Sequence, residues 1–106
     1  MASVFRKYIK IEQSEGYIYG IIEGRVAFIN YIYVKSEFRG NGVATNLIRQ
    51  FFDEIKKEGV VRVELDDCSD NYRKENNLYT VCGFKYKNSS GGEMHANVRN
   101  VIKRIN

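Results

Sequence analysis

The chain has 106 residues, a length that fits one folded domain spanning residues 1–106. A hydrophobic fraction of 43% and an aromatic fraction of 13% exclude an intrinsically disordered chain. The net charge of +4 and the pI near 9.1 suit an anionic partner such as a phosphate-rich cofactor, although an ordinary surface with extra Lys has the same balance.

The cysteines and the N-terminal residues indicate a reduced compartment and no membrane anchor. Cys68 and Cys82 are too few for a disulfide scaffold. Residues 1–10 mix Arg and Lys with apolar side chains, which is typical of neither a signal peptide nor a membrane span. We therefore expect a cytoplasmic protein with no membrane partner.

The first third of the chain predicts three strands, over Val4–Ile11, Tyr17–Ile22 and Val26–Val34. The short Gly-containing turns between them are typical of an antiparallel meander. The third strand is apolar on both faces, so we expect a central strand with material packed above and below it. Strict alternation puts Val26, Phe28, Ile32 and Val34 on one face and Ala27, Ile29, Tyr31 and Tyr33 on the other.

The rest of the chain mixes helices and strands. Apolar residues at helical spacing predict a helix over Val43–Lys57, and Gly59 ends it because glycine takes a left-handed cap without steric cost. The overall class is therefore α+β (mixed α/β), a meander followed by β-α-β-α-β-β. The later elements are a strand over Val60–Leu65, a helix from Arg73 to Val81 before Gly83, a strand over Phe84–Tyr86, and a strand carrying Met94, Ala96 and Val98.

A glycine-rich loop, Arg39–Thr45, lies between the third strand and the long helix. The first amides of a helix lack internal partners, and the helix dipole adds partial positive charge at that end. Gly40 and Gly42 let the backbone approach a ligand closely. The loop therefore predicts a phosphate-binding site.

Other interpretations of this loop compete. A P-loop needs Lys and then Ser or Thr after the last glycine, where Val43 and Ala44 stand. A dinucleotide fingerprint needs Gly or Ala at the position of Thr45; Glu64 could serve as its acidic residue, but the meander does not fit a doubly wound sheet. A glycine-rich turn without any ligand remains open.

Two motifs resemble one known family. Residues 39–44, Arg-Gly-Asn-Gly-Val-Ala, match the Q/R-x-x-G-x-G/A motif of the GNAT N-acetyltransferase superfamily. Residues 78–84, Leu-Tyr-Thr-Val-Cys-Gly-Phe, look like its late L-Y-x-x-x-G-F segment, and residues 32–38 look like its fourth strand and turn. The resemblance runs from about Tyr17 to Tyr86. It implies a GNAT-like fold, with a central mixed sheet and helices packed on it, and acetyl-CoA as cofactor.

The resemblance also assigns cofactor contacts. Backbone groups of the loop would hold the pyrophosphate, and the third strand would pair with the amide-bearing pantetheine arm as if with an added strand. Asn71 falls where the family often has an Asn that contacts the cofactor, but its spacing to Tyr79 is one residue longer than usual. The cofactor residues implied are Ile32, Tyr33, Val34, Arg39, Gly40, Asn41, Gly42, Val43, Ala44, Thr45 and Asn71.

Catalytic candidates follow from the same resemblance. Tyr79 matches the Tyr that protonates the leaving thiolate in many relatives, although it could simply be a packed aromatic. Asp66 falls where some relatives carry a Glu base at the end of the fifth strand, with Asp67 and Glu64 as alternatives and a solvated loop as the plain explanation. His95 is the only histidine, and no carboxylate or thiol is organised around it, so we expect no metal site.

These features favour an acetyl-CoA-dependent N-acetyltransferase that acts on a primary amine by direct attack in a ternary complex. A non-catalytic acyl-CoA-binding or protein-interaction module on the same scaffold is the alternative. A nucleic-acid binder is disfavoured because Lys and Arg are scattered along the chain. The strand and two helices with which the family usually begins are not recognisable, so the acceptor pocket would be open, completed in a homodimer, or absent. The amine itself is not readable.

Overall fold

The structure, a computed structural model, describes residues 6–68 and 77–105. They form a six-stranded sheet with helices and one short 3-10 turn, η1 (Ser36–Phe38). The strands are β1 (Arg6–Gln13), β2 (Gly16–Glu23), β3 (Val26–Val34), β4 (Arg62–Asp66), β5 (Lys85–Tyr86) and β6 (Glu93–Asn97), and the helices are α1 (Val43–Lys57), α2 (Leu78–Cys82) and α3 (Val98–Ile105).

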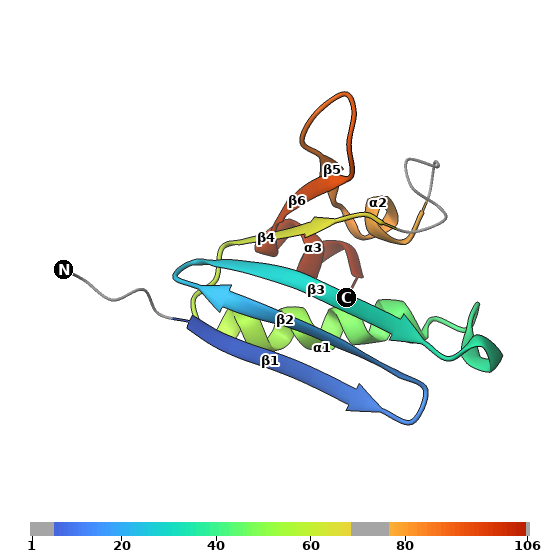
Figure 1. Cartoon of the computed structure of the whole chain (residues 1–106). Coiled ribbons are helices and arrows are strands. Elements are labelled where there is room, and N and C mark those ends of the chain that lie inside the picture. Colours follow the sequence, from blue (N-terminus) through green and yellow to red (C-terminus); the bar gives the residue numbers. More distant parts are fainter. Residues whose placement is uncertain (1–5, 69–76, 106) are drawn as a thin grey trace.

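The strand order across the sheet is β1-β2-β3-β4-β6-β5 (Figure 1). Neighbouring strands are antiparallel except for β3 and β4, which run parallel and are connected through α1. A parallel pair needs such a crossover because its two strands start at the same end of the sheet. The α+β class and the antiparallel meander are thus confirmed.

Helix α1 has the bounds that its periodicity predicts. Its apolar stripe packs on β1, β2 and β3, and its last residues are followed by Gly59 at φ +79°. Phe52 contacts Phe84 edge-on, with 6.0 Å between ring centroids, and so connects the meander half of the core to the C-terminal half. The buried residues of α1 are Leu47, Ile48, Phe51, Phe52 and Ile55.

The face assignment predicted for β3 is wrong beyond Ile29. The register with β2 shifts between Tyr19 and Gly20, because Tyr19 pairs with Tyr31 while Gly20 pairs with Ile29. Asn30 is the extra residue of a β-bulge, and a bulge of this kind exchanges the two faces of the strand. Ile32 and Val34 therefore pack against the core as Ala27 and Ile29 do, while Tyr31 and Tyr33 point away from it.

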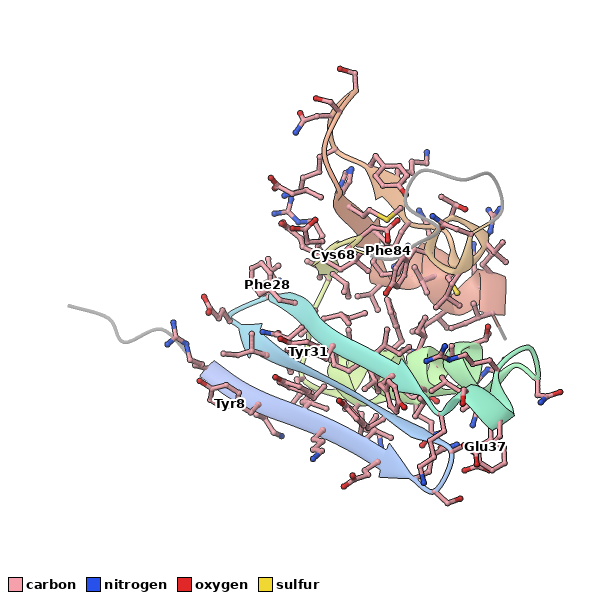
Figure 2. All side chains as sticks on the ribbon, turned by 45° about the vertical axis from the view of Figure 1, so that its right-hand side comes forward. Tyr8, Phe28, Tyr31, Glu37, Cys68 and Phe84 are labelled. Atoms are coloured by element: carbon pink, nitrogen blue, oxygen red, sulfur yellow. The ribbon has the colours of Figure 1, made fainter. Side chains whose placement is uncertain are left out.

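The expectation that β3 is covered on both faces is also wrong within the described residues. Helix α1 packs on β1–β3, and α3 packs on both α1 and β6, so the two helices cover the same face (Figure 1). The opposite face carries Tyr8, Tyr31 and Tyr33, which are 73%, 60% and 44% exposed. Figure 2 shows Tyr8, Phe28 and Tyr31 along β1 and β3.

The C-terminal residues form a helix that the alternation of Met94, Ala96 and Val98 does not predict. The strand ends at Asn97, whose side-chain oxygen accepts from the amide of Arg99. Val98 is therefore the first residue of α3, in which it and Val101 are buried. Helix α2 begins at Leu78, and residues 73–76 of the helix predicted there lie outside the described residues. Within the described residues, no helix combines the length and apolarity that a membrane span needs.

Candidate acetyl-CoA site

The mouth of α1, its N-terminal end at residues 40–45, presents backbone amides without a side-chain cap. Gly42 is the N-cap residue, and no side chain among the described residues accepts from the first amides of the helix. Gly42 and Gly40 have φ of +79° and +81°, a left-handed conformation that glycine adopts readily. A Cβ atom at either position would meet nothing within 4 Å, so the space in front of the loop is open. The first turn also carries no acidic residue that would repel an anion.

Beside this mouth, β3 runs past the end of its parallel partner. The pairing of β3 with β4 stops at Ile29 and Leu65, whereas β3 continues to Val34. The two strands diverge toward the loop that precedes α1 (Figure 1). Along this stretch no described strand pairs with β3 on its β4 side. An edge of this kind can accept an extended amide-bearing ligand.

A cleft of about 430 Å³ joins these two features. It brings together the predicted cofactor residues Ile32, Tyr33 and Val34 of β3 with the loop and first turn of α1, and it reaches Tyr79 on α2. Asn41 does not line it, and its side-chain amide donates to the carbonyl of Phe38. Asn71 lies outside the described residues. The residues of the cleft are Ile32, Tyr33, Val34, Phe38, Arg39, Gly40, Gly42, Val43, Ala44, Thr45, Asn77, Leu78 and Tyr79.

Sequence reasoning missed three of these residues as part of the site. Phe38 is the last residue of η1, which turns the chain between β3 and the loop. Asn77 and Leu78 stand at the start of α2, directly before Tyr79. The sequence held a signal for Leu78, since it belongs to the same motif as Tyr79, but none for Asn77.

Arg39 folds back over β3. Its Nε donates to the carbonyl oxygen of Val34 at 2.9 Å, and its guanidinium carbon lies 5.9 Å from the ring centroid of Tyr33. The side chain is exposed, and its charge therefore stands at the rim of the cleft next to the helix mouth. Its positive charge adds to the partial charge of the helix dipole there.

Tyr79 sits where the cleft meets the sheet. Its ring packs edge-on against Phe84 at 6.2 Å between centroids. Burial, together with the negative charge of Asp67, raises the pKa of Tyr79 to about 12. The phenol therefore keeps its proton throughout the physiological range. It can donate a hydrogen bond to a developing thiolate, but full proton transfer to a thiolate whose conjugate acid has a pKa of about 8.5 is uphill.

Asp67 is a structural residue. It is 3% exposed, and it accepts a 2.6 Å hydrogen bond from the hydroxyl of Tyr86 and a 3.2 Å bond from the side-chain amide of Asn77. Asn77 in turn caps α2, since its Oδ1 accepts from the amide of Thr80 at 2.9 Å. This network fixes the helix that carries Tyr79.

Asp66 and Asp67 do not act as a carboxylate pair. Asp66 is the last residue of β4 and is exposed, whereas the neighbouring Asp67 is buried. Glu64 is engaged by Lys87 at 2.5 Å and by Arg62 at 2.7 Å. The hydrogen bond from Lys87 holds the pKa of Glu64 below its ordinary value, which makes it a weak base. Among residues 6–68 and 77–105, no side chain forms an ion pair with Asp66 of the kind that engages Glu64.

The remaining candidates are the two cysteines and the histidine. Burial raises the pKa of Cys82, so this thiol is inert, while Cys68 is exposed beyond the end of β4. His95 pairs with Glu64 across β4 and β6. Within residues 6–68 and 77–105, no cluster of three or more metal-ligating side chains occurs.

Comparison with known families decides the assignment. The profile of the acetyltransferase (GNAT) family matches residues 8–84, which include the loop, the free edge of β3 and Tyr79. The chain belongs to the GNAT acetyltransferase family. Membership supports acetyl transfer from an acyl-coenzyme A at the level of the family. No curated protein sequence matches the chain significantly.

Solved structures agree on the fold. The anti-CRISPR protein AcrVA5 is 22% identical, with a TM-score of 0.67 over 84% of this chain and 97% of its own. An Escherichia coli N-acetyltransferase of a ribosomal-protein alanine is 20% identical, with a TM-score of 0.64 over 86% of this chain and 69% of its own. The PaiA N-acetyltransferase of Thermoplasma acidophilum, solved with coenzyme A, is 22% identical, with a TM-score of 0.66 over 77% of this chain and 52% of its own.

Proposed function

We propose that this GNAT domain binds acetyl-CoA in the cleft at the mouth of α1 and transfers the acetyl group to a primary amine. The observation that carries the proposal is the continuity of this cleft. It runs from uncapped amides, past the free edge of β3, to the phenol of Tyr79. The uncapped amides can bind a diphosphate, the free strand edge can pair with an amide-bearing arm, and the phenol can donate a hydrogen bond at the thioester.

The diphosphate would lie against the amides of Gly40–Thr45. Gly40 and Gly42 leave room for close approach, and Arg39 adds a positive charge at the rim. Each interaction of an anion with a helix N-terminus contributes about 0.3–1 kcal/mol at an exposed position. The pantetheine amides would pair with the backbone of Ile32–Val34. Arg39 already donates to the carbonyl of Val34, so this pairing would begin one residue earlier or displace that bond.

In the proposed reaction, the amine nitrogen forms a bond to the carbonyl carbon of the acetyl-CoA thioester, and the C–S bond breaks to release a thiolate. The proton that the nitrogen loses balances the negative charge of this thiolate. Tyr79 would stabilise that thiolate by a hydrogen bond, in keeping with its high pKa. Asp66 would accept the proton from the amine, because it is exposed at the end of β4 on the side from which an acceptor can approach.

A non-catalytic acyl-CoA-binding module is the second candidate. In this candidate the phenol of Tyr79 would only line the cleft and pack against Phe84. The two candidates share the cofactor site and differ only in turnover.

Two measurements test the proposal. Calorimetry with coenzyme A and with pantetheine, which lacks the diphosphate, should give saturable 1:1 binding for coenzyme A and weak binding for pantetheine. Release of free thiol from acetyl-CoA over a panel of primary amines should then exceed the rate without amine, and a Tyr79→Phe variant should be slower. Binding without turnover of any amine would favour the non-catalytic module, and absence of binding would overturn both candidates.

A further inference from the structure

A second opening meets the proposed cofactor cleft beside Tyr79. It has a volume of about 800 Å³ and lies between β3 and the end of β4. Ile32 and Tyr79 line both clefts, so the two meet beside the phenol. Phe28 and Cys68 border it from its two sides (Figure 2). We call this opening the acceptor groove; its residues are Phe28, Ile29, Asn30, Tyr31, Ile32, Glu64, Leu65, Asp66, Cys68, Tyr79 and Glu93.

The acceptor groove is locally acidic in a chain whose net charge is +4. Among the described residues that line it, the charged ones are Glu64, Asp66 and Glu93, and none is Lys, Arg or His. Lys87 and Arg62 pair with Glu64 from outside the groove. Lys87 reaches Glu93 only at 4.0 Å, and no described cation forms an ion pair with Asp66. Two carboxylates are thus left weakly compensated.

Those two carboxylates stand side by side. Asp66 and Glu93 are direct partners across β4 and β6, so their side chains share one face of the sheet. Like charges placed opposite each other in a sheet repel, and a cation held between them would remove the repulsion. Both residues are exposed, so a ligand can reach them without any opening of the fold.

The opposite wall of the acceptor groove is aromatic. Phe28 and Tyr31 lie on β3 and line the groove. The ring of Tyr31 stacks on the ring of Tyr19 with 5.3 Å between centroids, and this contact holds the orientation of Tyr31. Such rings pack against methylene groups and attract cations through their faces. The groove therefore combines an apolar path toward Tyr79 with negative charge along one side.

We propose that the acceptor groove selects a primary amine that carries a second cationic group a few methylenes away from the reacting nitrogen. This inference rests on the proposed function. The reacting nitrogen, next to Tyr79, must lose its proton to Asp66 before it attacks, whereas the second cation keeps its charge and lies beside Glu93, the cross-strand neighbour of Asp66. A polyamine and a lysine side chain among basic neighbours share this chemistry.

Acceptor competition tests the proposal. With acetyl-CoA saturating, kcat/KM is measured for a monoamine, a diamine of the same length, spermidine, a lysine peptide with basic neighbours and the same peptide with acidic neighbours. The dicationic acceptors should exceed the monoamine by about tenfold, and the basic peptide should exceed the acidic one. Spermidine and the basic peptide together tell which source of this chemistry the groove prefers.

Substitutions in the acceptor groove identify the residues that cause the preference for dicationic acceptors. Glu93→Gln should raise KM for the diamine by about fivefold, the effect of one charge pair near 4 Å in water, and leave the monoamine unchanged. Glu12→Gln is the matched control, because Glu12 is an exposed carboxylate on β1 outside the groove. Asp66→Asn separates two roles, since loss of recognition raises KM for dications alone, while loss of a base lowers kcat for every amine.

Equal rates for monoamine and diamine, or a cation preference that survives Glu93→Gln, would overturn the inference while the acetyltransferase proposal stands. Turnover of no amine at all would instead defeat the proposed function. The two failures are therefore distinguishable in one experiment.

Discussion

A single substitution at the mouth of α1 should change the stability of the fold and the affinity for the cofactor in opposite directions. Thr45 is the third residue of α1, it lines the cleft, and the first turn contains no acidic residue. In Thr45→Glu, the new carboxylate should stabilise the helix by about 0.3–1 kcal/mol through the dipole. The same charge should repel a bound diphosphate.

The size of the repulsion follows from Coulomb's law. Two unit charges about 4 Å apart interact by about 1 kcal/mol in water, so a diphosphate that carries about two negative charges loses about 2 kcal/mol, or roughly 30-fold in affinity. Urea unfolding measures the stability, and calorimetry measures the affinity for coenzyme A. Thr45→Gln is the matched control, because it has nearly the same shape and helix propensity without the charge.

Salt provides a further check on this reasoning. Raising the ionic strength from about 0.1 M to about 1 M shortens the Debye length from about 10 Å to about 3 Å, so the affinity difference between the Glu and Gln variants should shrink. Wild-type affinity in Thr45→Glu, or an equal loss in Thr45→Gln, would refute the placement of the diphosphate at this helix end.

Three further predictions concern Tyr79 and the network behind it. Tyr79→Phe should lower kcat by about 10–100-fold, the loss of one hydrogen bond to a charged group, with the affinity for coenzyme A unchanged; an unchanged kcat in stopped-flow thiol release would remove Tyr79 from the chemistry. The pKa of Tyr79 is raised to about 12 in the folded state, so between about pH 10 and pH 12 the native state binds one proton more than the unfolded state. The stability of the wild type should therefore fall across that window more steeply than the stability of Tyr79→Phe. Urea titrations at several pH values measure this difference. Asp67→Asn should cost about 1–3 kcal/mol of stability because it disturbs the buried bonds from Tyr86 and Asn77, whereas the exposed Asp66→Asn should cost less than about 0.5 kcal/mol; equal losses would contradict the structural role of Asp67.

The parts of the fold that local pattern determines could be predicted from the sequence. Helix α1 has a wide apolar stripe with glycines at both ends, and both signals lie within the segment itself. The bulge at Asn30 could not be predicted, because it depends on how β3 aligns with Tyr19 and Gly20 of another strand. A polar residue inside an apolar strand was its only local sign.

Helix α3 was missed for a different reason. Val98, Val101, Ile102 and Ile105 stand at helical spacing, but the alternation of β6 runs directly into Val98. Because the two-residue period of the strand continues through Val98, it hid the start of the helical period. The separate roles of Asp66 and Asp67 could not be predicted from the strand expected over Val60–Leu65, because β4 ends at Asp66 and Asp67 is held by the side chains of Tyr86 and Asn77. The acceptor groove was beyond local pattern, because it forms from strands that diverge in space.

The most direct test of the account is a nitrogen–proton correlation NMR titration with coenzyme A. If the helix mouth binds the diphosphate, the largest amide shifts should fall on Gly40, Gly42 and residues 43–45, and they should be absent in a titration with pantetheine. Shifts that instead concentrate on distant residues such as Lys56 or Asn97, or that stay small everywhere at saturating coenzyme A, would contradict it.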